Sequence, residues 1–192
     1  IPEEGAPEGE QVLLDVNALA EGHDFFALGA STVSDSGDLL AYSVDVAGDE
    51  RFELFIKDLR SGELLEDRLE GIFYGATWVG EEFIFYTTVD DAWRPDTVWR
   101  HRVGTPQSED VVVMREEDSR FGIGVGTTRS EKYIMIVSGS KTTNEAWVLE
   151  QSTPEGEFRC LWERETGVDY DVDHAVVGGT DYWVVTHNAT GP

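Results

Sequence analysis

Short apolar and β-branched runs, separated by polar turns, recur along almost the whole chain. Residues 98–103 alternate in polarity and lead into a Gly/Thr/Pro/Gln/Ser segment, and a second β-branched run follows at 110–113. This order is typical of a β-hairpin. Residues 17–22 could form a single helical turn or a loop, and no other stretch has the period of a long amphipathic helix. The pattern therefore predicts an all-β protein.

The expected strands fall into groups of four that are joined by tight turns. These groups occupy residues 28–69, 73–116, 121–163 and, with two strands only, 170–192. Their second strands begin at residues 39, 82, 132 and 180. This spacing is in the range of β-propeller blades, and a four-stranded blade cannot cover both of its faces alone. We expect a partial β-propeller of three complete blades with flanking part-blades.

The two ends of the chain carry separate expectations. Residues 1–9 are rich in Pro, Glu and Gly, which predicts a flexible N-terminal arm before a propeller region at 10–192. Residues 11–15 are expected to form a short strand that ends a preceding blade. The chain has no initiator Met and stops after a strongly β-like run, so we expect a piece of a longer protein.

Three glycines alternate in the run Phe121–Thr127, at positions 122, 124 and 126. Their spacing differs from the G-x-G-x-x-G of nucleotide-binding loops, and no helix is expected after them. Glycine in the innermost strand of a blade fits the crowding near a propeller axis. We therefore interpret these glycines as structural.

Charge and composition narrow the possible partners. The chain has 14 basic and 39 acidic residues and a formal charge of -25, which argues against nucleic acid or an anionic membrane as a partner. A cationic partner fits this charge, and a solubility adaptation without a partner is the alternative. The single Cys160 excludes an internal disulfide and suggests a core residue of a cytoplasmic protein. No membrane-spanning run or signal peptide is present.

No catalytic or metal-binding motif stands out. A G-x-S-x-G nucleophile elbow is absent, and the four histidines are too widely separated in sequence to place a triad or a zinc site. Asp169, Asp171 and Asp173 have the spacing that begins a calcium loop, but His174 and Thr180 stand where Gly and Glu are needed. On a strand these aspartates would share one face, either lining a channel or solvated. A carboxylate pair for glycoside hydrolysis remains an alternative.

Several segments resemble the N-terminal propeller domain of the prolyl oligopeptidase family, with most similarity to its oligopeptidase B (protease II) branch. These segments are residues 10–15, 22–29, 39–45, 57–63, 98–110 and 170–174. The resemblance implies a fragment of a seven-bladed propeller from a serine peptidase. It also implies that catalysis belongs to an α/β-hydrolase domain that this sequence lacks, so no catalytic, cofactor-binding or metal-binding residue is assigned.

In this family the propeller caps the active site and restricts access to short peptides. The resemblance thus implies an inactive fragment whose partners are the catalytic domain and short, cationic peptides, cleaved after Arg or Lys or after Pro. A non-enzymatic propeller that binds a peptide or protein is the alternative. Arg100, His101, Glu109 and Asp110 are expected on the blade surface. The unpaired edge near residues 182–187 predicts self-association of the isolated fragment.

Overall fold

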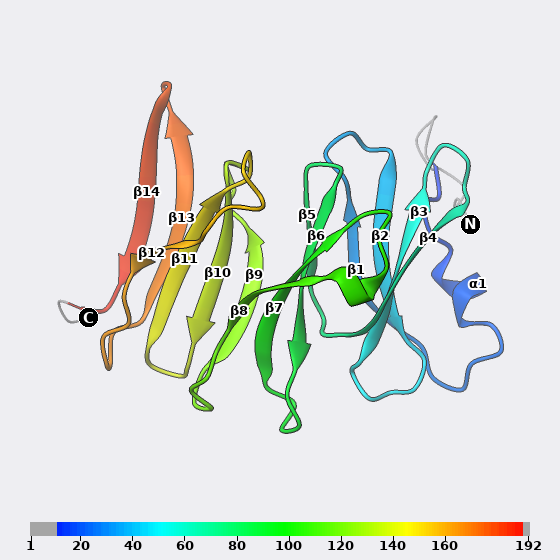
Figure 1. Cartoon of the computed structure of the whole chain (residues 1–192), viewed down its shortest axis with the longest axis horizontal. Helices are drawn as coiled ribbons and strands as arrows, with labels where there is room; N and C mark the ends of the chain where they lie inside the picture. Colours follow the sequence, from blue (N-terminus) through cyan, green and yellow to red (C-terminus); the bar gives the residue numbers. More distant parts are fainter. Residues whose placement is uncertain (1–10, 190–192) are drawn as a thin grey trace, which may run out of the picture.

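The computed structural model describes residues 11–189, so the arm expected at 1–9 lies outside the described part (Figure 1). The described chain forms a short helix, α1 (Val16–Ala20), a 3-10 turn, η1 (Gln107–Glu109), and 14 strands. The strands are β1 (Ala27–Val33), β2 (Leu39–Asp45), β3 (Phe52–Asp58), β4 (Leu64–Ile72), β5 (Ala76–Val79), β6 (Phe83–Val89), β7 (Pro95–Arg102), β8 (Val111–Arg115), β9 (Gly122–Thr127), β10 (Tyr133–Gly139), β11 (Asn144–Glu150), β12 (Arg159–Trp162), β13 (Tyr170–Val177) and β14 (Thr180–His187).

These strands form a row of antiparallel sheets in chain order. Sheet A contains β1 to β4, sheet B contains β5 to β8, sheet C contains β9 to β12, and sheet D is the hairpin β13–β14. In every sheet each strand pairs with its neighbour in sequence, and the sheets stack along the long axis of the molecule (Figure 1). The prediction of an all-β partial propeller is confirmed.

Burial on both faces explains why the sheets stack. In β10, Ile134 and Ile136 are fully buried toward sheet B, while Met135 and Val137 pack toward sheet D. Three buried clusters fill the three spaces between sheets A and B, B and C, and C and D. A strand that is apolar on both faces must be covered on both, so each sheet depends on its neighbours.

The meander topology gives the stack two edges and two faces. Strand β5 packs against both β1 and β9, so the first strands of sheets A to C converge on one edge, which we call the inner edge. The opposite edge is the outer edge. The turns that join the first strand of a sheet to its second, and the third to the fourth, lie at one end of the strands, here named the hairpin face. The turns that join the second strand to the third, and the connections between sheets, lie at the other end, the loop face.

The prediction of a strand at residues 11–15 is wrong. In the described chain Val12 and Leu13 pair with no strand and are 47% and 36% exposed, because no neighbouring strand offers them hydrogen bonds. The segment instead leads into α1, which Asp15 caps by accepting hydrogen bonds from the backbone nitrogens of Asn17 and Ala18, both at 3.1 Å. A helical turn was one of the two alternatives at residues 17–22.

Crowding does not explain the glycines of β9. A Cβ atom at Gly124 or Gly126 would meet no heavy atom within 4 Å, and one at Gly122 would only touch Pro95 at 3.4 Å. The crowded glycine lies in β1 instead. A Cβ at Gly29 would come within 2.6 Å of both the Phe52 Cδ1 and the Ser43 Oγ atoms. Sequence alternation alone could not show this approach, because Phe52 belongs to β3.

We therefore predict opposite outcomes for two alanine substitutions in first strands. Gly29→Ala should lower the free energy of unfolding by about 1–3 kcal/mol, because Phe52 is fully buried and must move. Gly124→Ala should change it by less than about 0.5 kcal/mol, because the added methyl group enters open space. Urea denaturation of both variants measures the difference, and equal midpoints would contradict the packing described for Gly29.

Candidate functional site

Within residues 11–189, several of the buried polar side chains gather in three clusters at the junctions between sheets. The A/B cluster contains Asp67, Tyr86, His101 and Asp110. The B/C cluster contains Glu116, Ser138, Glu145 and Arg164. The C/D cluster contains Ser130, His174 and Asp181. Because such groups are costly to bury without partners, these clusters are the places to look for chemistry.

The A/B cluster is centred on His101, in β7, whose side chain is fully buried. Its Nδ1 atom lies 2.6 Å from Asp110 Oδ1 and its Nε2 atom lies 3.0 Å from Asp67 Oδ1. A carboxylate only accepts hydrogen bonds, so a protonated imidazolium satisfies both contacts. Burial lowers the pKa of His101, but hydrogen bonds and charges from Asp110 and Asp67 outweigh it and raise the pKa above its usual value.

Neighbouring groups complete this cluster. The Tyr86 hydroxyl donates to Asp110 Oδ2 at 2.7 Å, and burial together with this contact raises the pKa of Tyr86. The Gly104 backbone nitrogen donates to Asp67 Oδ1 at 2.5 Å. Asp67 lies in β4, whereas His101 lies in β7 of sheet B and Gly104 in the segment that follows β7. The cluster therefore joins sheet B to β4, the last strand of sheet A.

This finding corrects the expected position of the hairpin residues. Glu109 is exposed, as a blade-surface residue should be. His101 is fully buried and the Asp110 side chain is 1% exposed, so both belong to the junction instead. Arg100 is half-buried and donates to the Pro154 carbonyl oxygen at 2.9 Å. The error arose because β4, which covers the hairpin, lies more than thirty residues earlier in the chain.

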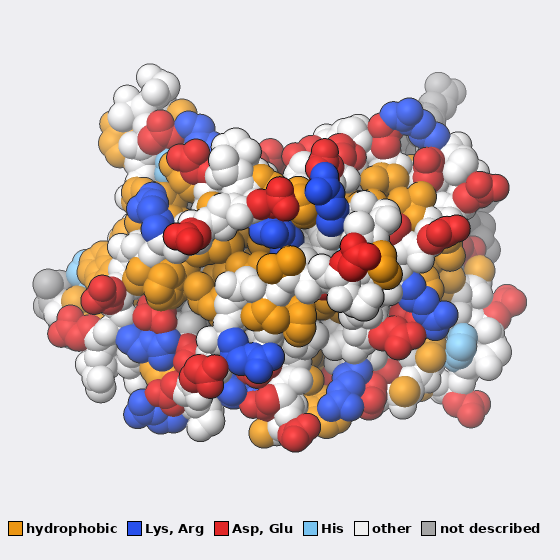
Figure 2. All heavy atoms as spheres, in the orientation of Figure 1, with side chains coloured by type: hydrophobic (Ala, Val, Ile, Leu, Met, Phe, Trp, Pro, Cys, Tyr) orange, Lys and Arg blue, Asp and Glu red, His pale blue; other side chains and the backbone are white. Residues whose placement is uncertain are grey.

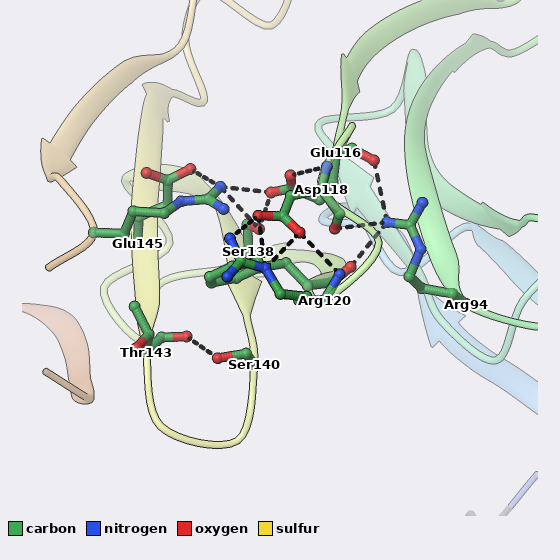
Figure 3. Close-up of polar contacts among 10 residues, drawn as sticks. Arg94, Glu116, Asp118, Arg120, Ser138, Ser140, Thr143 and Glu145 are labelled. Atoms are coloured by element: carbon green, nitrogen blue, oxygen red, sulfur yellow. Dashed lines mark hydrogen bonds and ion pairs between the residues drawn. The ribbon is translucent and has the colours of Figure 1, made fainter. Parts of the chain in front are cut away.

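The B/C cluster lies on the loop face, where Figure 3 shows Glu116, Ser138 and Glu145 directed toward one centre. Arg164, from the connection between β12 and β13, pairs with both Glu116 and Glu145. The Ser138 hydroxyl donates to Glu116. Burial raises the pKa of Glu116, but the hydrogen bonds from Ser138 and Arg164 outweigh it and lower the pKa below its usual value.

Two further arginines support the same loop. Arg94 donates to the carbonyl oxygens of Glu116 at 3.1 Å and Phe121 at 2.8 Å, which fixes the chain between β8 and β9 (Figure 3). Arg120 pairs with Asp118 at 2.5 Å. The Arg164 guanidinium also lies 4.0 Å from the centre of the Phe121 ring. Arg164 pairs with both glutamates and Arg120 with Asp118, so each charged side chain has a partner within the chain, as in a structural junction.

The C/D cluster has the composition of a hydrolase triad. His174 Nδ1 lies 2.8 Å from Ser130 Oγ, and His174 Nε2 lies 3.3 Å from Asp181 Oδ1. No sequence motif links these residues, because Ser130 and His174 are 44 positions apart. Folding places them together where β9 turns into β10 beside sheet D.

The surroundings of this triad differ from those of a nucleophilic serine. His174 is 1% exposed beneath Tyr133 and Trp183, whose ring centres lie 4.8 and 4.9 Å away. Asp181 is half exposed and its charge is paired with Lys132. Ser130 Oγ is 3.1 Å from Thr128 Oγ1, and the equivalent turn of sheet A repeats this contact between Ser34 and Ser36. The geometry fits a turn motif that links sheet C to sheet D.

The remaining candidates carry no site. No group of three or more His, Cys, Asp or Glu residues suited to a metal ion occurs among residues 11–189. Asp171 is exposed, whereas Asp173 accepts a hydrogen bond from the Arg129 backbone nitrogen at 2.9 Å. Burial raises the pKa of the half-buried Cys160 thiol, which keeps it protonated at neutral pH. No helix of the described chain is long and apolar enough to span a membrane.

Comparison with known proteins gives a consistent result. The family described as "Prolyl oligopeptidase, N-terminal beta-propeller domain" matches residues 1–192. Protease 2 of Moraxella lacunata is 37% identical over 168 residues, which cover 86% of this chain and 24% of that protein. Dipeptidyl aminopeptidase BI of Pseudoxanthomonas mexicana is 38% identical over 189 residues, which cover 95% of this chain and 25% of that protein. The chain thus spans about a quarter of these relatives' length.

Solved structures show the same similarity. Oligopeptidase B from Leishmania major matches with a TM-score of 0.88 and 30% identity, over 99% of this chain and 27% of that one. Oligopeptidase B from Trypanosoma brucei, in a closed form with covalently bound antipain, matches with a TM-score of 0.84 and 36% identity, over 99% of this chain and 26% of that one. The similarity extends over the whole row of sheets.

The A/B cluster predicts a pH-dependent stability. The pKa of His101 is raised in the folded state, so its contribution is complete below the unfolded-state pKa of about 6.5 and is lost as pH rises through the folded-state pKa. His101→Gln should lower the free energy of unfolding by about 3 kcal/mol at pH 6, because it leaves two buried carboxylates without their cation. The deficit should shrink at higher pH.

Urea denaturation of wild type and variant from acidic to alkaline pH measures this change. His23→Gln is the matched control, because His23 is exposed and its side chain makes no hydrogen bond in the described chain. It should follow the wild-type profile. A constant difference between wild type and His101→Gln across the pH range would refute the charged state assigned to His101.

Proposed function

Since the chain belongs to the prolyl oligopeptidase family, as its N-terminal β-propeller domain, we propose that it caps the active site of an oligopeptidase B-like serine peptidase. One observation carries this proposal. The row of sheets superimposes on oligopeptidase B over 99% of the chain while covering only about a quarter of that enzyme. The chemistry then belongs to the α/β-hydrolase domain of the parent protein, and no residue of this chain is catalytic.

The junctions support a capping role. Each of the three spaces between sheets combines an apolar core with a polar cluster that joins the two sheets. Opening a gap between two blades would expose the apolar core of that junction to water and break its polar cluster, so such a gap would open rarely. In such a propeller, substrate can enter only through openings that are present while the blades remain packed together. Such a cap favours short peptides over folded proteins.

The charge supports cationic peptides as substrates. With a net charge of -25, the chain attracts positive ligands over distances of about a Debye length. Acidic side chains are spread across the face visible in Figure 2, with Lys and Arg interspersed. The resemblance to the oligopeptidase B branch implies cleavage after Arg or Lys. The matches to oligopeptidase B at 36% and 30% identity support that branch over a prolyl endopeptidase of Elizabethkingia meningoseptica, which is 24% identical. We place the parent enzyme in the cytoplasm, in line with the single unpaired Cys160.

An activity measurement tests this function. The 192-residue chain should not hydrolyse an Arg-containing fluorogenic peptide, whereas the protein from the full reading frame should. For that protein, kcat/KM should be at least about tenfold higher for the Arg peptide than for its uncharged citrulline counterpart, and added salt should reduce the difference. Turnover by the 192-residue chain that a serine-directed inhibitor abolishes would overturn the assignment. A reading frame with further blades and no hydrolase domain would instead favour a peptide-binding or protein-binding module.

We also propose that the isolated chain self-associates through sheet D. Val177, Tyr182 and Val184 lie on its outer face with exposures of 64%, 51% and 54%, and β14 has only β13 as a partner in the described chain. Light scattering at high protein concentration should report a mass above that of the monomer. Val184→Lys should shift the mass toward the monomer, and a monomeric wild type would contradict the proposal.

A further inference from the structure

A hollow of about 410 Å³ opens at the A/B junction, on the outer edge of the stack. The start of β4 and the segment that follows β7 form its walls. Its lining residues are Leu65, Glu66, Asp67, Val103, Gly104, Thr105 and Pro106. We propose that this hollow binds a small organic cation carried on a short aliphatic chain, such as an alkylammonium or alkylguanidinium group.

Asp67 is a carboxylate whose hydrogen-bonding capacity is only partly used within the chain. Asp67 is 6% exposed, and its Oδ1 atom accepts both hydrogen bonds that the residue makes, from His101 and Gly104. No hydrogen bond to its Oδ2 atom is found in the described chain, and Asp67 lines the hollow. Asp110, in contrast, uses both oxygens, toward His101 and Tyr86. Asp67 therefore offers the hollow a strong acceptor held in a fixed position.

The A/B cluster and the hollow beside it carry a residual negative charge. Two carboxylates, Asp67 and Asp110, face one imidazolium, so the buried cluster carries one unbalanced negative charge. The exposed Glu66 at the hollow adds another. Among residues 11–189, no Lys or Arg side chain forms an ion pair with Glu66 or Asp67. An uncompensated buried charge is costly, and a bound cation would neutralise it.

The walls of the hollow have a suitable shape and are rigid. Leu65, Val103 and Pro106 give an apolar surface suited to a methylene chain. The loop that carries Pro106 is held against β4, because Gln107 both accepts from the Glu70 backbone nitrogen and donates to the Glu70 carbonyl oxygen, each at 3.0 Å. The hollow is therefore formed before a ligand arrives, which reduces the ordering cost of binding.

The same features favour an organic cation over a metal ion. A calcium or magnesium ion needs about six oxygen ligands, and the described chain contains no metal-suited group of His, Cys, Asp or Glu here. One buried acceptor at the end of an apolar hollow suits a single ammonium or guanidinium group with an aliphatic stem. The group could belong to a free amine or to a basic side chain of a peptide, and the two sources are separable by experiment.

Calorimetric titration of the 192-residue chain with agmatine tests the proposal. Saturable binding is expected, and n-pentylamine should also bind, whereas the uncharged 1-pentanol should not. Asp67→Asn should weaken agmatine binding by about tenfold or more, because it removes the buried charge. Glu66→Gln should weaken it by about twofold. The matched control is Asp171→Asn, which removes an exposed carboxylate of β13 in sheet D, away from the A/B junction, and should leave binding unchanged.

A second variant covers the case in which Asp67→Asn fails to fold. Thr105→Trp keeps the A/B cluster and fills the hollow, so it should abolish binding while the circular dichroism spectrum stays that of wild type. Equal affinity of agmatine for wild type and Thr105→Trp, or no saturable binding to wild type, would overturn the proposal. Comparing agmatine with the peptide Gly-Arg-Gly distinguishes a free amine from a peptide side chain. The site does not rest on peptidase activity, so either proposal can fail alone.

Discussion

Apolar burial between neighbouring sheets is the constraint on which the rest of this structure depends. Sheets B and C each pack apolar side chains on both faces, so neither can bury its own side chains without a sheet on either side. Apolar burial is strong but non-directional, so by itself it would tolerate sliding of one sheet over the next. The polar clusters fix the relative position of neighbouring sheets, because their hydrogen bonds form only in one alignment.

The three clusters achieve this alignment with different chemistry. An imidazolium between two aspartates joins sheets A and B, an arginine between two glutamates joins B and C, and a serine with a histidine joins C and D. A buried ion pair contributes little net stability compared with an apolar pair of the same volume, but a mismatched one is strongly destabilising. Because the three junctions differ in chemistry, one blade of this propeller cannot replace another without mismatching a polar cluster.

Alternation of apolar and polar residues predicts most of this fold, because strand formation and tight turns are local properties. The strand expected at 11–15 failed because pairing requires a partner that local sequence does not reveal. The clusters could not be predicted for the same reason. His101 joins a residue 34 positions earlier, and Arg164 joins one 48 positions earlier, with no motif linking them. A signal that could have helped is the rarity of histidine within an apolar strand run, such as His101 in β7, where it needs a buried partner.

The spacing of the junction contacts bears on how the chain folds during synthesis. Hydrogen bonds between neighbouring sheets join residues 44 to 49 positions apart in several places, including Ser130 with His174 and Lys132 with Asp181. Each junction can therefore close as soon as one more blade has left the ribosome, without waiting for distant sequence. The apolar face of a newly synthesised blade stays exposed until the next blade has been translated, which takes a few seconds at the usual rate. In this row of sheets, chain order and assembly order coincide.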